Sequence, residues 1–326
     1  MDAAREPRTL QEAILFFSDY ANCHAAMMAV RWPDGVVTCP RCGSTKVTYL
    51  QNANLWKCYG GHPRAKFSLK VGTIFEDSPL PLQKWLPALW LLTNCKNGIS
   101  SYELGRALGV TQKTAWFMLS RLRLALQDKS SGGKLSGEVE VDETFIGGKA
   151  RNMHKSKLKR LKLTQSNPMV GKVAVMGLLE RTSDTRKSRV RTAIVPNTRR
   201  SHLRPQIDKH IERGSTVYSD SLPSYKDLSA DDAYVHNVID HAECYAKGNV
   251  HTNGMENFWS LLKRAIKGTY VSIEPFHLFR YLDEQAFRFN EREGDDPARF
   301  KSAIKGIVNR RLTYKALTGK LEPETC

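Results

Sequence analysis

The sequence of 326 residues predicts an α/β protein in which a mixed β-sheet flanked by helices follows two small N-terminal modules. Three observations lead to this prediction. Beyond residue 137 the apolar residues alternate or form short runs, which is typical of strands. Three cysteines and one histidine crowd into residues 39–62. Residues 101–122 have the apolar spacing of two short helices joined at a glycine.

The composition favours a polyanionic partner. Lys and Arg number 50 against 33 acidic residues, a formal net charge of +17, and residues 149–162 contain no acid at all. Excess charge can simply keep a protein soluble, but clustered cations also bind nucleic acid by releasing condensed counterions. No apolar run approaches the roughly 18–20 residues of a membrane span, and the N-terminus lacks a hydrophobic signal core. We therefore expect a cytoplasmic protein with no membrane partner.

The first module, residues 36–78, is predicted to be a zinc ribbon that follows an N-terminal helical segment at residues 1–35. Cys39 and Cys42 form a C-x2-C knuckle, and Cys58 and His62 form a C-x3-H pair. Two such pairs can complete the tetrahedral site of a structural Zn²⁺. The odd count of seven cysteines argues against a disulfide framework. The alternative is a reduced pair of buried cysteines beside an unrelated surface histidine.

The second module, residues 79–126, is predicted to be a helix-turn-helix DNA-binding domain. A helix over 84–95 precedes a pair of helices with Gly109 at their turn and Thr111 as the N-cap of the second. The second helix of such a motif enters the major groove. Candidate DNA contacts are therefore Gln112, Lys113 and Trp116 near its start, with Arg121 and Arg123 extending a basic edge. A purely structural helix pair is the alternative.

After a Gly/Ser-rich linker at residues 127–136, the pattern predicts the largest domain, residues 137–292, and a basic C-terminal tail, residues 293–326. Its first three strands are expected to form an antiparallel meander. The predicted elements are strands at 138–145, 172–180 and 188–196, a helix at 201–212, strands at 215–220 and 233–239, and a helix at 253–268.

Three carboxylates stand out in this domain. Asp142 interrupts an apolar alternating strand, Asp220 ends the fourth strand, and Glu256 lies in the late helix. If the first and fourth strands are neighbours, with the helix across their ends, the three acids meet, which is costly unless cations neutralise them. Two divalent metal ions, typically about 3.5–4 Å apart, would do so and would activate an oxygen nucleophile for phosphoryl transfer. Individually, Asp220 could cap a turn and Glu256 could be a solvated helix residue.

Motifs along nearly the whole chain resemble those of the IS1595 group of insertion-sequence transposases, whose catalytic part is called the ISXO2-like domain. They include TCPRCGS, EVEVDETFIGGK, VYSDSLPSY and VHTNGMENFWSLLKRAIKGTY. The resemblance implies a ribonuclease-H-like catalytic domain with a DDE triad. By motif match the triad is Asp142, Asp220 and Glu256, which would bind Mg²⁺ or Mn²⁺.

The resemblance also implies a basic residue beyond the glutamate, here Lys263, seven residues after Glu256 and so on the same helix face. It would hold DNA near the scissile phosphate, with Arg264 as a further candidate contact. Asn253 lies one turn before Glu256, and in some relatives an asparagine is held to replace the glutamate. Many relatives have a second C-x2-C pair where this sequence has Cys58 and His62.

The sequence therefore predicts a DNA transposase that binds the terminal inverted repeats of its element and catalyses metal-dependent strand cleavage and strand transfer. Its partners would be double-stranded DNA, both element ends and target, and by analogy a second copy of the chain in a homodimer or larger assembly. Two alternatives remain. One is a nuclease of the same fold without strand transfer, and the other is a DNA-binding regulator with a decayed catalytic domain.

Overall fold

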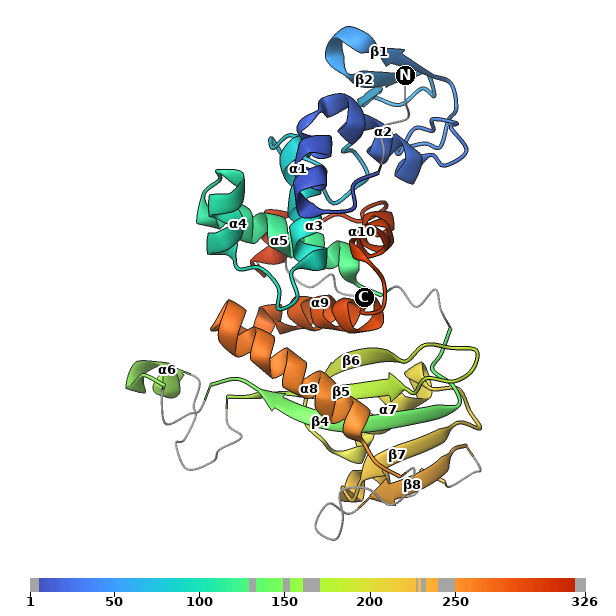
Figure 1. The fold of residues 1–326 in the computed structure, drawn as a ribbon, viewed down its shortest axis with the longest axis vertical. Coiled ribbons are helices and arrows are strands. Elements are labelled where there is room, and N and C mark those ends of the chain that lie inside the picture. Colours follow the sequence, from blue (N-terminus) through green and yellow to red (C-terminus); the bar gives the residue numbers. More distant parts are fainter. Residues whose placement is uncertain are drawn as a thin grey trace. The chain divides into compact units, whose positions relative to one another are not determined.

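The computed structural model describes residues 6–128, 133–148, 153–160, 171–226, 228–229, 233–239 and 250–319. The chain divides into two compact units (Figure 1). Unit 1 comprises Met1–Gln127 and Glu293–Cys326, and unit 2 comprises Asp128–Arg292. The predicted linker at 127–136 spans this boundary, and residues 129–132 of it lie outside the described part. No described helix is long and apolar enough to cross a membrane.

Unit 1 joins a small sheet to a helical bundle. Its helices are α1 (Leu10–Ser18), α2 (Tyr20–Arg31), α3 (Leu82–Asn94), α4 (Ser101–Leu108), α5 (Gln112–Leu126), α10 (Asp296–Lys305) and α11 (Tyr314–Leu317). Strands β1 (Val47–Leu50), β2 (Leu55–Cys58) and β3 (Lys66–Phe67) form an antiparallel sheet in that order. Trp56 of β2 is buried between His24 of α2 and Phe67 of β3, with ring centroids 5.7 and 5.8 Å away. Aromatic stacking thus supplies the core of this small module.

The predicted helix pair is present as α4 and α5, following α3. Ser100 caps α4 through a capping box with Glu103, Gly109 ends it with a φ of 61°, and Thr111 caps α5 by accepting from the Thr114 N–H. A side chain at Gly105 would lie 3.0 Å from the Val110 carbonyl oxygen, so a glycine lets α4 approach the turn. The local sequence signals therefore predict these helix ends correctly.

The C-terminal segment is not a free basic tail. Helix α10 packs against α3 and α5 of unit 1, and the ring of Phe300 lies 5.3 Å from Phe17 and 5.4 Å from Trp90. The Ile74 N–H donates to the Ile307 carbonyl oxygen at 3.0 Å. The apolar stripe of Phe300, Ala303 and Ile304, three and four residues apart, explains this packing, although basic residues surround it in the sequence.

Unit 2 is built on a five-stranded mixed sheet. Its strands are β4 (Glu138–Ile146), β5 (Val173–Glu180), β6 (Arg189–Val195), β7 (Thr216–Asp220) and β8 (Val235–Ile239). Their order is β6-β5-β4-β7-β8. The β4, β5 and β6 pairings are antiparallel, whereas β7 pairs with β4 and β8 in parallel. The predicted meander, and the predicted pairing of the first strand with the fourth, are both confirmed.

Helices cover both faces of this sheet, as Figure 1 shows. Helix α7 (Arg200–His210) packs its Leu203 and Ile207 against Val139 and Val141 of β4. On the other face lie α8 (Asn253–Ala265), a π-helical turn at Ile266–Tyr270, and α9 (Leu278–Asn290). The short helix α6 (Lys155–Arg160) comes between β4 and β5 in the sequence. The central strand β4 is therefore covered on both sides, which makes its charged residues conspicuous.

We predict that Phe300→Ala destabilises unit 1 by about 3–5 kcal/mol, the usual cost of truncating a buried aromatic ring. Phe300 is 7% exposed, whereas Phe276 in unit 2 is 52% exposed, so Phe276→Ala is a suitable control. That control should change stability by no more than about 0.5 kcal/mol. Urea unfolding of the full-length chain measures both effects, and equal shifts for the two variants would contradict the packing of α10.

Candidate functional site

The register of β4 and β7 aligns the first two predicted acids. Val139 pairs with Val217 and Glu140 with Tyr218. Asp142 and Asp220 each come two residues after the pair of Glu140 and Tyr218. They therefore lie beside each other on the same face of the sheet. The Trp259 Nε1–H of α8 donates to Asp142 Oδ2 at 2.9 Å, so this is the face covered by α8. Adjacent strands are about 4.8 Å apart, which brings the two carboxylates into close electrostatic contact.

The third acid, Glu256, comes from α8. This helix buries Met255, Phe258, Trp259 and Leu262 and leaves Glu256 exposed. Asp142 pairs in register with Gly177 of β5, where a Cβ atom would lie 2.6 Å from the Trp259 ring. The missing side chain lets the indole lie over β5 and reach Asp142. Because Glu256 is three residues before Trp259, the helix holds it at the same part of the sheet.

The electrostatics of Asp142 reflect this crowding. Burial raises its pKa to about 6. Hydrogen bonds from the Glu143 N–H, at 2.8 Å, and from Trp259 oppose that rise, while the charges of Asp220 and Glu256 add to it. Neutral pH therefore places an ionised carboxylate in a site where other carboxylates repel it, which is the setting in which a cation binds favourably.

Glu143 points to the opposite face of β4, as the alternation of the strand requires, and accepts a hydrogen bond from the Tyr225 hydroxyl. Burial, followed by the charges of Asp142 and Asp220, raises the pKa of Glu143 to about 9. This neighbour is therefore held in its neutral form at neutral pH, on the α7 side of the sheet.

Asp142, Asp220 and Glu256 offer hard oxygen ligands, the type that Mg²⁺ and Mn²⁺ prefer. Among the described residues, however, only the group of Cys39, Cys42, Cys58 and His62 brings three or more ligand atoms within 4.8 Å of one another. The donor chemistry of the acidic group fits a hard divalent cation, and Glu256 is the exposed member that would complete the set.

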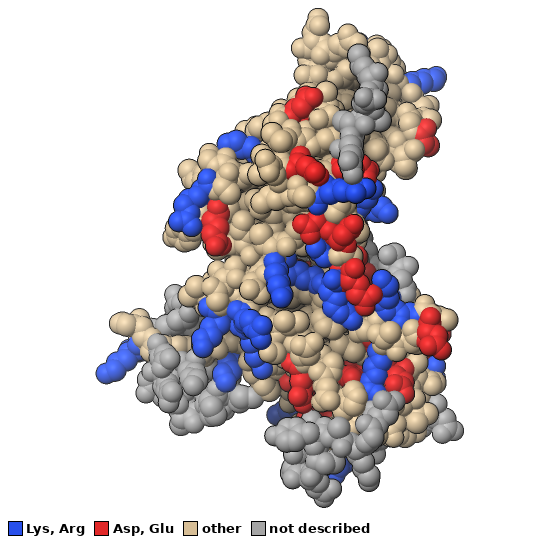
Figure 2. Space-filling model, in the orientation of Figure 1, with Lys and Arg blue, Asp and Glu red and all other residues tan. Residues whose placement is uncertain are grey.

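The candidate DNA contacts differ in accessibility. Gln112 and Lys113 are exposed at the start of α5, and Trp116 is partly buried. Lys263 and Arg264 are exposed on α8. Figure 2 shows a patch of Lys and Arg side chains over the C-terminal half of this helix. Of the basic run at 149–162, the structure describes residues 153–160, which include α6.

Arg121 and Arg123 do not form an exposed basic edge. They are 5% and 2% exposed. The Arg121 guanidinium donates to the carbonyl oxygens of Ile74 and Glu76, at 3.0 and 2.8 Å, and lies over the Phe117 ring. The expectation from charge alone is wrong here, because a guanidinium can be buried when carbonyl acceptors and an aromatic face meet it.

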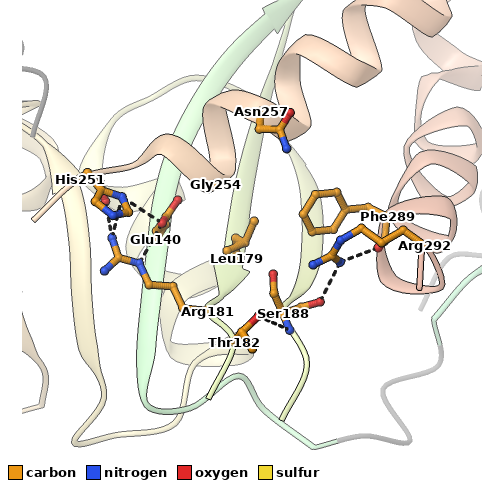
Figure 3. Close-up of a pocket in the computed structure, with 10 residues that line it drawn as sticks. All are labelled: Glu140, Leu179, Arg181, Thr182, Ser188, His251, Gly254, Asn257, Phe289 and Arg292. Atoms are coloured by element: carbon orange, nitrogen blue, oxygen red, sulfur yellow. Dashed lines mark hydrogen bonds and ion pairs between the residues drawn. The ribbon is translucent and has the colours of Figure 1, made fainter. Parts of the chain in front are cut away.

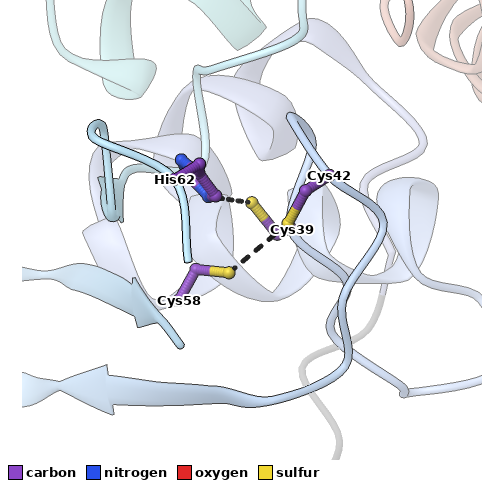
Figure 4. Close-up of side chains that lie close together, drawn as sticks. All are labelled: Cys39, Cys42, Cys58 and His62. Atoms are coloured by element: carbon purple, nitrogen blue, oxygen red, sulfur yellow. Dashed lines mark hydrogen bonds between the residues drawn. The ribbon is translucent and has the colours of Figure 1, made fainter. Parts of the chain in front are cut away.

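The four predicted zinc ligands come together in unit 1 (Figure 4). Cys39 Sγ lies 3.3 Å from His62 Nε2, and Cys42 Sγ lies 3.6 Å from Cys58 Sγ. Zn–S bonds of about 2.3 Å in a tetrahedron give ligand separations of about 3.8 Å, so this spacing fits a zinc ion. The site has four protein ligands and no open position, which is the form of a structural site.

Local backbone geometry explains why these ligands converge. Gly43 closes the knuckle with a φ of 72° and a hydrogen bond to the Cys39 carbonyl oxygen at 2.8 Å. Gly60 donates its N–H to Cys58 Sγ at 3.2 Å, and a Cβ at this position would lie 2.9 Å from Cys42 Sγ. Burial disfavours the Cys39 thiolate, but hydrogen bonds from the Arg41 and Cys42 backbone and from His62 outweigh it and lower its pKa to about 7.

Sequence reasoning missed two residues that link β4 to α8 beside the acidic group. Trp259 donates to Asp142, and Glu140, only 1% exposed, accepts from the Met255 N–H of α8 at 2.9 Å. A signal for Glu140 was present, because the strand sequence EVEVD places it on the same face as Asp142. Neither residue type by itself distinguishes such a role.

Comparisons with known proteins agree with the motifs. Residues 134–290 match the model of the ISXO2-like transposase domain, and residues 18–60 match that of the transposase zinc-ribbon domain. The zinc-ribbon match ends before His62, which the sequence spacing predicts as the fourth ligand and which the structure places beside the three cysteines. An "Uncharacterized protein in transposable element ISH50" from Halobacterium salinarum is 26% identical over 291 residues, covering 87% of this chain and 94% of that protein.

We predict one tightly bound Zn²⁺ per chain. Cys58→Ala should lose the ion and unfold residues around 36–78, because zinc binding contributes roughly 10–16 kcal/mol to such modules. His62→Ala should weaken zinc binding, and Cys95→Ala, outside the cluster, should leave it unchanged. Elemental analysis and competition with a chelator measure these effects. Full zinc retention in His62→Ala would remove this residue from the ligand set.

We predict that Asp142→Asn stabilises unit 2 at neutral pH, when no Mg²⁺ or Mn²⁺ is added, but not below about pH 4. The folded protein holds the pKa of Asp142 at about 6, above its ordinary value of 3.8. Protonated Asp142 therefore stabilises the folded protein fully at pH values below the pKa of this group in the unfolded chain. This contribution is lost as the pH rises through its pKa in the folded protein. A shift of about 2 pKa units corresponds to as much as about 3 kcal/mol.

Unfolding midpoints of the natural chain and the Asp142→Asn variant, measured between about pH 4 and pH 8, check this prediction. Added Mg²⁺ should raise the midpoint of the natural chain above about pH 6 and leave that of the variant unchanged. A difference between the two proteins that is constant over this pH range would contradict it.

Proposed function

Because this chain belongs to the ISXO2-like family of IS1595 transposases, we propose that it is a DNA transposase in which Asp142, Asp220 and Glu256 are the catalytic metal ligands. The observation that carries the proposal is the alignment of Asp142 and Asp220 on adjacent parallel strands beneath the helix that bears Glu256. Two acids on neighbouring strands and a third on a covering helix suit the binding of divalent cations for phosphoryl transfer.

A ribonuclease-H-like fold is proposed for unit 2. Three antiparallel strands followed by two parallel ones, in the order β6-β5-β4-β7-β8, support it, as do helices on both faces. In this proposal Asp142 on β4, the first strand of the domain, and Asp220 on β7, the fourth, supply two of the three acids. Helix α8 then supplies the third acid across the strand ends.

Each residue has a defined task in this proposal. Asp142 and Asp220 are fixed to the sheet and would bind the metal ions from there. Glu256 would add a ligand from the exposed surface of α8. When bound, Mg²⁺ or Mn²⁺ would lower the pKa of the attacking water or 3′-hydroxyl and stabilise the leaving oxygen. Lys263 and Arg264, exposed farther along α8, would position the DNA backbone at the acids.

Element ends are proposed to be bound by unit 1. The zinc ribbon and the helix pair α4–α5 would act as the recognition modules, α5 entering the major groove with Gln112 and Lys113 at its exposed start. A net charge of +17 supports binding to a polyanion. Coordinated cutting of two ends would require a homodimer or larger assembly on DNA, acting in the cytoplasm. The relative in a transposable element agrees with this setting.

A donor assay tests the reaction. Supercoiled DNA carrying both element ends, with labelled termini, should yield cut and then joined product in Mg²⁺. Asp142→Asn, Asp220→Asn and Glu256→Gln should each eliminate cleavage while leaving binding to the ends intact, and double variants should be no worse than single ones. Asp184→Asn, which changes an exposed acid of unit 2, is the matched control and should cleave normally.

The outcomes separate the alternatives. Cut product without joining would make the protein a nuclease, and end binding without cleavage by the natural chain would make it a regulator. Normal cleavage by Asp142→Asn would end the transposase proposal. Normal cleavage by Glu256→Gln would transfer the third role to Asn253, which is exposed one turn earlier on α8.

A further inference from the structure

Helix α8 begins without a cap of its own. The residue before it, Thr252, makes no side-chain hydrogen bond to the first turn, although the first N–H groups of a helix need acceptors. The Met255 N–H instead donates to Oε2 of Glu140 at 2.9 Å. Glu140 belongs to β4, so the strand that carries Asp142 also caps the helix that carries Glu256.

Glu140 is held in place by further charged partners. The Glu140 side chain is almost completely buried. Its Oε1 accepts a hydrogen bond from Arg181 Nε–H at 2.8 Å and lies 3.5 Å from His251 Nδ1. Arg181 also donates to the His251 carbonyl oxygen at 2.7 Å. Figure 3 shows these three side chains together on one wall of a cavity of about 280 Å³ beside Gly254. The cluster ties β4, the end of β5 and the entry to α8 to one another.

Two glycines allow the close approach. A Cβ at Gly254 would lie 2.8 Å from Glu140 Oε2 and 3.1 Å from Leu179. At Gly177 it would meet Met255 and Trp259. Neither glycine has the positive φ that would itself call for one. Their role is therefore to bring α8 against the sheet.

The helix and the strand are matched in spacing. Met255 contacts Glu140, and Trp259 contacts Asp142. Four residues of helix advance about 6.0 Å and two residues of strand about 6.6 Å, so both hydrogen bonds can form at once. Glu256 lies between these two points, and its position along β4 is fixed by them.

We propose that Glu140 is a positioning residue that fixes α8 on β4 and thereby sets the place of Glu256 relative to Asp142. This inference rests on the proposed function of the three acids. Asp142 and Asp220 are held by strand pairing, whereas Glu256 stands on a helix that is hydrogen-bonded to the sheet through Glu140 and Asp142. Residues that orient metal ligands in this way usually contribute 10- to 100-fold to metal affinity.

The test is Mn²⁺ binding to the full-length, zinc-loaded protein without DNA, measured by calorimetry. Glu140→Gln removes the charge of the cap, and Gly254→Ala keeps the charge but displaces the helix from it. Both should weaken the Mn²⁺ affinity by about 10- to 100-fold, with the circular dichroism spectrum and the DNA affinity unchanged. Gly268→Ala is the matched control, because a Cβ there meets nothing within 4 Å. It should bind Mn²⁺ as the natural chain does.

A second readout is the Mn²⁺ concentration for half-maximal cleavage, which should rise in both variants while the Kd for DNA stays constant. Natural Mn²⁺ affinity in folded Glu140→Gln and Gly254→Ala would overturn the inference. Failure of both variants to fold would also overturn it, since Glu140 would then serve stability instead of position. Asp142→Asn should abolish Mn²⁺ binding at the acidic site. If the natural chain binds no Mn²⁺, or if the variant binds it equally well, the proposed function itself fails.

Discussion

The burial of carboxylates in the central strand β4 is the constraint on which unit 2 depends. Glu140 and Asp142 are two residues apart on the same face, beneath the same helix. The charge of Glu140 is balanced by Arg181, and its carboxylate caps the N-terminus of α8. Among the residues that the structure describes, Asp142 has hydrogen bonds but no ion pair with a cationic side chain, and it faces two further acids. A buried charge without a partner is unstable, so the strand carries one carboxylate paired within the protein and one, Asp142, that we propose binds a metal ion.

The packing of α8 follows from this arrangement. Its buried side, with Met255 and Trp259, must approach the sheet closely enough to serve both carboxylates, and glycines at 177 and 254 remove the side chains that would prevent it. Its exposed side then presents Glu256 and Lys263 along one face. The acid proposed to bind metal and the base proposed to bind phosphate are thus held by the same rigid element, which is how a preorganised site avoids reorganisation during a reaction.

Unit 1 solves a different problem, because a small three-stranded sheet has little apolar surface to bury. The Cys39, Cys42, Cys58 and His62 group and the stacking around Trp56 stabilise that sheet. The neighbouring helices gain their stability from the return of the chain, since Phe300 of α10 fills the space between Phe17 and Trp90. Residues far apart in sequence therefore complete one core.

The sequence by itself determined the elements whose signals are local. Strand alternation around Asp142, the cap at Thr111, the glycine at 109 and the C-x2-C knuckle each act within a few residues, so period and spacing were sufficient. The strand order, and with it the juxtaposition of Asp142 and Asp220, could be expected because few sheet topologies accommodate a meander followed by a helical crossover.

Only the tertiary structure decided which charges are buried. Arg121 and Arg123 look like DNA contacts in the sequence, but they lie in the interior of unit 1. Residues 293–319 look like a basic tail, but α10 packs through an apolar stripe. Glu140 looks like one more surface acid of an alternating strand, but Arg181 and the start of α8 enclose it. In each case the partners are residues tens to hundreds of positions away, and a local pattern can show an apolar stripe or a strand face but cannot show which distant residues will cover it.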